Sequence, residues 1–292
     1  MFLKEMGVIQ MNENKTNINS YPGHMAKTKR LVNEQEKIID IVYEIIDARI
    51  PYSSKIAKEN NLLNNKPHIL IFNKIDLCDM KATSKWIKYY KDLGYHVITM
   101  SLKEKVSFKS VIDLTNSILE DKIMKKKASG INQKEIKALV MGIPNVGKST
   151  FINHFVGRQV ANTGNKPGVT KSITWLKTNS NILLLDTPGI LWPKITEERV
   201  AYNLASFSAI KEENIPVPKV AYYILNMLDK YYPEKLQRYG LEKLTDDVES
   251  DYNIIGKKMG LLTHGGEVDY NKINLRIIND IRKENIKEIT FD

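Results

Sequence analysis

The sequence predicts an α/β domain with a doubly wound, mostly parallel sheet, followed by a small all-helical C-terminal domain. Over residues 21–200, short apolar runs with the length of buried strands alternate with helical segments, as in sheets wound by crossover helices. From about Ala201 onward the pattern is helical. A chain of 292 residues suits two domains. We expect a flexible tail at residues 1–20, the α/β domain at 21–200 and the helical domain at 201–292.

The α/β domain divides at a linker. Before it, strands rich in Ile, Val and Phe alternate with helices. These elements are predicted as a helix at 25–38, strands at 41–49 and 69–72, a helix at 83–93, a strand at 96–101 and a helix at 108–127. Residues 125–135 are basic, small and polar, which indicates the linker. After it we expect a strand at 136–141, a helix starting near residue 148 and paired strands at 172–178 and 181–189.

Composition excludes several classes of protein. No apolar run approaches the roughly 18 residues of a membrane helix, and the first 20 residues lack the apolar block of a secretory signal. The single cysteine, Cys78, excludes a disulfide framework and a zinc site built from several cysteines. We therefore expect a cytoplasmic protein that does not bind membranes.

The positive charge is uneven along the chain. The net charge is +10, and residues 1–204 hold 31 Lys and Arg against 19 Asp and Glu, while residues 205–292 hold 13 against 15. A basic first part indicates a polyanionic partner, with RNA favoured over a membrane because no basic amphipathic anchor is evident. The alternative is a protein from a lysine-rich proteome, with no such partner.

A phosphate-binding loop follows the predicted strand at 136–141. Gly-Ile-Pro-Asn-Val-Gly-Lys-Ser, at 142–149, matches the pattern GxxxxGK[ST]. Glycines let backbone amides turn towards phosphate oxygens, and the start of the next helix adds a positive dipole. Lys148 would bridge the β- and γ-phosphates, and Ser149 would ligate Mg²⁺. The nucleotide-binding residues expected in this loop are Asn145, Val146, Gly147, Lys148, Ser149 and Thr150.

A second phosphate motif is Asp-Thr-Pro-Gly, at 186–189, after an apolar strand. Asp186 can hold Mg²⁺ through water, and the amide of Gly189 can reach the γ-phosphate. Between the two motifs, Thr170 has the position of a switch threonine that completes the metal shell when a triphosphate is bound. Taken alone, Thr170 could equally be a plain loop residue.

Asn-Lys-Ile-Asp, at 73–76, follows a buried strand and has the form of a guanine-binding motif, although it precedes the phosphate loop. Asp76 can accept hydrogen bonds from both N1–H and the exocyclic amine of guanine, with Asn73 and Lys74 beside it. The alternative downstream, Asn-Lys-Ile-Asn at 271–274, ends in an amide and follows no buried strand. The base motif is therefore the upstream one.

Ser101-Leu102-Lys103 ends the next predicted strand and resembles the serine-x-lysine loop that backs the guanine, so Ser101 and Lys103 are also expected at the nucleotide. Two base motifs in proper order before the phosphate loop predict a circularly permuted P-loop GTPase. Permutation is tolerated when the new join lies in a surface loop, here the linker. The chain then passes from the motif at 186–189 directly into the helical domain.

Further segments extend this pattern, namely Tyr-Pro-Gly-His-Met-Ala-Lys at 21–27, Asp-Ala-Arg-Ile-Pro-Tyr-Ser-Ser at 47–54 and the Gly-Leu-Leu-Thr-His-Gly-Gly-Glu-Val-Asp run at 260–269. With them, the sequence resembles the ribosome biogenesis GTPase A family over roughly residues 20–290. The resemblance implies GTP and GDP as ligands, with Mg²⁺. It also implies binding to a late precursor of the large ribosomal subunit, with its rRNA and nearby ribosomal proteins, and release after hydrolysis. We expect the protein to act as a monomer.

The resemblance also gives His24 a role. Ile190 stands where many GTPases have a glutamine that orients the attacking water, and in the resembled family the histidine of the segment at 21–27 is implicated in hydrolysis. The alternative is that His24 is a polar residue at a helix start.

Asn145 is a candidate K⁺ ligand, because an asparagine at this loop position ligates the ion in GTPases that use K⁺ in place of an arginine finger. The alternative is that Asn145 merely tolerates an unusual turn.

Together these features predict a GTP hydrolase acting in large-subunit assembly. Two alternatives remain. One is a GTP-gated RNA-binding scaffold with negligible turnover, and the other is a permuted GTPase that acts on another RNA or at a membrane.

Overall fold

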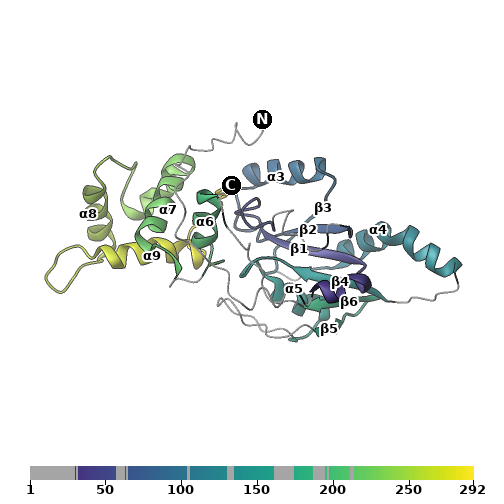
Figure 1. The fold of residues 1–292 in the computed structure, drawn as a ribbon. Helices are drawn as coiled ribbons and strands as arrows, with labels where there is room; N and C mark the ends of the chain where they lie inside the picture. Colours follow the sequence, from purple (N-terminus) through teal and green to yellow (C-terminus); the bar gives the residue numbers. More distant parts are fainter. Residues whose placement is uncertain are drawn as a thin grey trace.

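The computed structural model describes residues 30, 32–56, 63, 65–103, 106–129, 135–160, 174–186, 195, 197–210 and 214–292. These residues form a six-stranded sheet with helices on both faces, and a group of helices beside one end of it (Figure 1). None of the helices in these ranges has the length and apolar content needed to cross a bilayer.

The sheet has the strand order β3-β2-β1-β4-β6-β5. Every neighbouring pair is parallel except β5 and β6, which are antiparallel. The strands are β1 (Ile41–Asp47), β2 (His68–Asn73), β3 (His96–Thr99), β4 (Ile136–Met141), β5 (Thr174–Lys177) and β6 (Ile182–Asp186). The predicted doubly wound, mostly parallel sheet is confirmed.

Helices α3 (Met80–Asp92), α4 (Lys109–Ala128) and α5 (Lys148–Val156) flank the sheet. Because successive side chains of a strand point to opposite faces, Leu70 and Phe72 of β2 pack with Trp86 of α3. Ile69 and Ile71 belong to the larger core on the other face. Both faces of β2 are therefore covered, which explains the uninterrupted apolar run Ile69–Phe72.

Two predicted strands are shorter than expected. The strand predicted at 41–49 ends at Asp47, because the Asp47 carboxylate accepts a hydrogen bond from the backbone N–H of Arg49 at 3.0 Å and turns the chain. The strand predicted at 96–101 ends at Thr99, and the next two residues begin the loop towards α4.

The C-terminal part is helical, as predicted. It contains α6 (Glu198–Ser206), α7 (Val217–Tyr231), the 3₁₀ helix η4 (Pro233–Tyr239), α8 (Val248–Met259) and α9 (Tyr270–Arg282). A short 3₁₀ helix, η1 (Glu36–Ile38), precedes β1. Figure 1 shows α7, α8 and α9 grouped away from the sheet, with α6 between them and the sheet. The predicted division at residues 200 and 201 falls within α6, and it stays a prediction about domain organisation.

The last residues of the chain return to the α/β part, and Figure 1 shows the C-terminus beside α3. The indole Nε1 of Trp86 donates a hydrogen bond of 3.2 Å to the backbone oxygen of Asp292. The buried carboxylate of Asp292 also accepts hydrogen bonds from Ser53 and from Asn203 of α6. These bonds attach the helical part to the edge of the sheet at which β1 and β2 end.

Candidate guanine nucleotide site

The phosphate loop connects β4 to α5 and has the tight geometry that its glycines allow. Gly147 precedes α5 with φ +105°, a conformation that residues with a Cβ rarely adopt. A Cβ at this position would lie 2.3 Å from Nδ2 of Asn73. Glycine is therefore required both by the turn and by the close approach of the β2 end to the loop.

Lys148 begins α5 and lies across this loop. Its Nζ donates a hydrogen bond of 2.8 Å to the backbone oxygen of Ile143. Burial lowers the pKa of Lys148 to about 8, against an opposing effect of the Asp186 charge. An anionic ligand stabilises the charged form of a buried ammonium group more than that of an exposed one. Ser149 and Thr150 follow in the first turn of α5, and both are half-buried.

Asp186 ends β6, and its Cα is paired with Val140 of the neighbouring strand β4. Its side chain is buried, with an exposed fraction of 6%. Since β4 and β6 are parallel, Asp186 and the phosphate loop leave the sheet at the same edge. The structure thus brings Lys148, Ser149 and Asp186 to one place.

Asn73 joins three of the predicted motifs. Its Nδ2 donates a hydrogen bond of 2.7 Å to the backbone oxygen of Val146 in the phosphate loop. Its Oδ1 accepts one of 3.3 Å from the backbone N–H of Leu102, between Ser101 and Lys103. The end of β2, the end of β3 and the phosphate loop are therefore held together by a single buried amide side chain.

Lys74 makes a second bridge to the phosphate loop. It has φ 65°, and its Nζ donates hydrogen bonds to the backbone oxygen of Asn145 at 2.9 Å and to Asp47 Oδ2 at 3.0 Å. Asp47 also accepts hydrogen bonds from Nε and Nη2 of Arg49. Burial favours the neutral form of Asp47, but the charges of Arg49 and Lys74 outweigh it and hold its pKa well below the usual value.

No role is predicted for Asp47 and Arg49 from the sequence. In the structure they position Lys74 in the loop at 73–76, the base loop. The available signal was a carboxylate directly after a buried strand, at the edge where parallel α/β sheets bind ligands. A buried pair of this kind keeps Lys74 in a fixed position beside the phosphate loop.

The other residues predicted to contact the base are Asp76, Ser101 and Lys103. Lys103 Nζ is 3.6 Å from Asp76 Oδ2, and both side chains are partly exposed. The hydroxyl of Ser101 is buried and has no hydrogen-bond partner in the described part of the chain. A buried polar group without a partner is costly, so a polar ligand at this position would relieve it. The residues present fit a guanine base here.

Asn145 has the left-handed backbone of a turn residue, with φ 65°. Its Nδ2 donates a hydrogen bond of 2.5 Å to the backbone oxygen of Ser208, after α6. This bond orients the amide and connects the phosphate loop to the helical part. The turn geometry agrees with the alternative interpretation of Asn145, and K⁺ binding stays a prediction.

Three predicted site residues, His24, Thr170 and Gly189, lie outside the described residues. Their roles stay predictions. The rival motif at 271–274 lies within α9, where the buried Asn274 accepts a hydrogen bond of 2.7 Å from the Tyr252 hydroxyl. It belongs to the helical core and not to a strand end.

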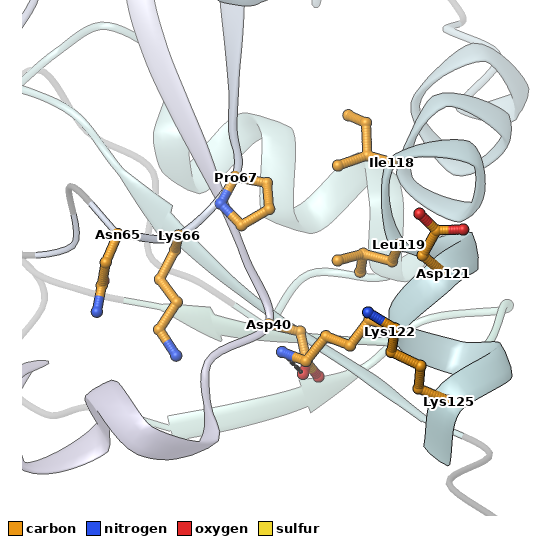
Figure 2. A pocket seen from close by; sticks show the side chains of 9 residues that line it. All are labelled: Asp40, Asn65, Lys66, Pro67, Ile118, Leu119, Asp121, Lys122 and Lys125. Carbon is orange, nitrogen blue, oxygen red and sulfur yellow. Dashed lines mark ion pairs between the residues drawn. The ribbon is translucent and has the colours of Figure 1, made fainter. Parts of the chain in front are cut away.

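A hollow separate from these residues has a volume of about 520 Å³. Figure 2 shows the side chains that line it. Asp40 and Pro67, which line it, directly precede β1 and β2, and Lys122 of α4 forms an ion pair of 2.8 Å with Asp40. It therefore lies at the amino ends of the strands. Ligands of parallel α/β sheets bind at the carboxyl ends, so this hollow is distinct from the nucleotide site.

The sequence matches known proteins along most of its length. A family model described as 50S ribosome-binding GTPase matches residues 137–258, and one described as RsgA GTPase matches residues 58–196. Ribosome biogenesis GTPase A of Priestia megaterium is 41% identical over 93% of this chain and 95% of that protein. The chain belongs to the ribosome biogenesis GTPase A family. The protein of the same name from Bacillus licheniformis is 42% identical over 93% of this chain and 96% of that protein.

Solved structures agree on the fold. A GDP-bound structure of the Thermotoga maritima protein YlqF shares 24% identity, with a TM-score of 0.64 over 90% of this chain and 98% of that one. A GNP-bound structure of the same protein gives a TM-score of 0.63. The circularly permuted GTPase fold followed by a helical part is confirmed. As a member of this family, the protein is a GTPase of ribosome biogenesis that binds GTP and GDP with Mg²⁺.

Proposed function

We propose that this GTPase assists assembly of the large ribosomal subunit in the cytoplasm, binding a late precursor as a monomer in the GTP state and leaving after hydrolysis. The observation that carries the nucleotide-dependent part of the proposal is the Asn73 bridge, which joins the end of β2 to Leu102 and to Val146 of the phosphate loop. Relatives named for ribosome biogenesis and a family description naming the 50S ribosome support the choice of partner.

Guanine selectivity is assigned to the loops after β2 and β3. Asp76 would accept the two N–H groups of guanine, because a carboxylate offers two acceptor oxygens. Ser101 would offer its buried hydroxyl to the base. Asn73 and Lys74 hold the loop against the phosphate loop, and Lys103 lies beside Asp76.

The phosphates and the metal are assigned to the phosphate loop and the end of β6. Lys148 would neutralise the β- and γ-phosphates, and the amides of Val146, Gly147 and Thr150 would surround them. Ser149 and Asp186 would hold Mg²⁺, with Thr170 joining them in the triphosphate state. Mg²⁺ supplies charge neutralisation at the phosphates.

Hydrolysis is assigned to Gly189 and His24, with K⁺ held through Asn145. Gly189 would offer its amide to the γ-phosphate, and His24 would orient the attacking water, which the apolar Ile190 cannot do. K⁺ would take the amide oxygen of Asn145, since the nitrogen donates to Ser208.

The ribosomal surface is assigned to both parts of the chain. We propose a GTPase domain at 21–200 and an rRNA-contacting helical domain at 201–292, after a tail at 1–20. The first part carries the excess positive charge, which favours contact with rRNA phosphates. In the slightly acidic helical part, Lys257 and Lys258 in the last turn of α8 are both exposed and offer a local basic patch.

The test is co-sedimentation with large ribosomal subunits. The protein should sediment with subunits in the presence of a non-hydrolysable GTP analogue and remain unbound with GDP. In depleted cells, gradient profiles should show a stalled large-subunit precursor. As a control, Asp76→Asn should lose binding with the GTP analogue and regain it with the corresponding xanthosine analogue. Equal sedimentation in both nucleotide states, or normal subunit profiles after depletion, would contradict the proposal.

A further inference from the structure

The segment that follows α9, residues 283–292, packs against the loops of the guanine site. The backbone N–H of Glu288 donates a hydrogen bond of 2.8 Å to Leu77, directly after the base motif. The N–H of Phe291 donates one of 2.8 Å to Arg49. Ile286, Ile289 and Phe291 are buried, so this C-terminal segment is anchored by apolar contacts as well as by backbone bonds.

Glu284 lies at the start of this segment, in a turn that neighbouring residues define. It has φ 62°, and its backbone N–H donates to the oxygen of Ile281 at 3.2 Å. Nδ2 of the next residue, Asn285, donates to the carboxylate of Asp280 at 2.8 Å. These hydrogen bonds hold the backbone that carries the Glu284 side chain in one conformation.

The carboxylate of Glu284 forms a hydrogen-bonded ion pair with Nζ of Lys103. This pair joins the helical part to the loop that follows β3. The hydrogen bond that Lys103 donates to the Glu284 carboxylate raises the pKa of Lys103, so the lysine stays fully charged at neutral pH. The same Nζ lies 3.6 Å from Asp76 Oδ2. Lys103 is thus shared between two carboxylates, with the closer contact to Glu284.

This sharing matters because Asp76 needs both oxygens for guanine. A lysine that paired with Asp76 alone would compete with the N–H groups of the base for the same acceptor. Arg49, Lys74 and Asp47 also lie at this loop, and the Glu284 charge acts on both Arg49 and Lys74. Without Glu284, Asp76 is the remaining carboxylate that Lys103 contacts among the described residues, so Lys103 would move towards Asp76.

We propose that Glu284 is a positioning residue for guanine recognition, which holds Lys103 beside Asp76 and keeps the Asp76 carboxylate available to the base. The guanine site is thereby completed by the helical part of the chain. This inference rests on the proposed role of Asp76.

The experiment measures GDP affinity of the full chain by calorimetry, with GDP chosen because it is not hydrolysed. Glu284→Gln keeps the size of the side chain and removes its charge, and it should weaken GDP binding roughly tenfold, the effect of one charge-assisted hydrogen bond. Glu284→Asp should restore part of the affinity. Glu288→Gln is the matched control, because this acid is in the same segment but its side chain is 79% exposed.

A double variant tests whether the effect of Glu284 on GDP affinity depends on Lys103. If Glu284 acts through Lys103, the loss caused by Glu284→Gln should disappear in a Lys103→Met background. A role of Glu284 through any group other than Lys103 would persist in that background. Native-like GDP affinity in a folded Glu284→Gln variant, or an equal loss with and without Lys103, overturns the proposal. If Asp76→Asn fails to shift preference towards xanthosine diphosphate, the base assignment itself is wrong, and the two failures are thus distinguishable.

Discussion

Nδ2 of Asn73 donates a hydrogen bond of 2.7 Å to the backbone oxygen of Val146, 73 residues later in the chain. This bond joins the end of β2 to the phosphate loop, although the chain order of the two motifs is permuted. Circular permutation leaves the contacts between strands and loops intact when the new join lies outside them. The relation between base loop and phosphate loop therefore depends on the sheet and not on the order in which its strands are made.

Asp76→Asn should exchange GTP for xanthosine triphosphate. The amide can donate to the extra carbonyl of xanthine but can no longer accept both N–H groups of guanine. Each lost charge-assisted hydrogen bond costs about 1.5–3 kcal/mol, so GTP affinity should fall at least ~10-fold. Titration with both nucleotides measures the change. Asp92→Asn, in an exposed ion pair with Lys88 at the end of α3, is the control and should bind GTP normally. Unchanged GTP affinity in Asp76→Asn would remove Asp76 from the base site.

Nucleotide binding should take up a proton near pH 8 because of Lys148. The pKa of this buried lysine is lowered to about 8 in the free protein, so roughly half of the molecules carry it uncharged at that pH. Anionic phosphates favour the charged form and raise its pKa. Calorimetry of GDP binding in two buffers of different ionisation enthalpy should show roughly half a proton taken up at pH 8, and much less at pH 7.

Lys148→Arg provides the control for this proton, because arginine stays charged at both pH values. The variant should lose the difference between pH 8 and pH 7, whatever its affinity. Equal proton uptake by the native protein at both pH values would show that Lys148 is not the group that titrates.

Replacing K⁺ with Na⁺ should slow GTP turnover if Asn145 ligates K⁺. Asn145→Ala should abolish the difference between the two salts. Alanine in the left-handed conformation of this residue costs about 1–2 kcal/mol, and the hydrogen bond to Ser208 is also lost. The measured quantity is therefore the ratio of rates in K⁺ and Na⁺, which does not depend on the amount of folded enzyme. A ratio of one for the native protein would leave Asn145 as a turn residue.

His24→Ala should bind GTP and the large subunit normally but lose most of the hydrolysis that the subunit stimulates. We expect slow turnover in the free protein, because Ile190 cannot orient water and His24 has to be brought to the γ-phosphate. Completing such a site from a partner is worth ~10³–10⁵ in rate. The measurement is single-turnover hydrolysis with saturating large subunits, comparing native protein and variant. Equal stimulation of both would make His24 a helix-start residue and assign the water to rRNA or K⁺.

The α/β class, the helical C-terminal part and the motifs of the nucleotide site could all be predicted from the amino-acid sequence. Each of these is encoded within a few residues. Ile69–Phe72 has the composition of a buried strand, GxxxxGK[ST] combines turn glycines with a helix start, and Asp76 differs from Asn274 by the number of acceptor oxygens. Local chemistry of this kind is visible without the fold.

The distant residues that support that site could be identified only from the folded structure. Asp47 and Arg49 hold Lys74, and Glu284 reaches Lys103 across 181 positions of the chain. Neither arrangement has a periodicity or spacing that a sequence displays. The first arrangement depends on how the chain turns at the end of β1. The second depends on how the segment after α9 packs against the base loop. The Glu284 contact follows from the burial of Ile286, Ile289 and Phe291, whose apolar character alone does not specify the surface they cover.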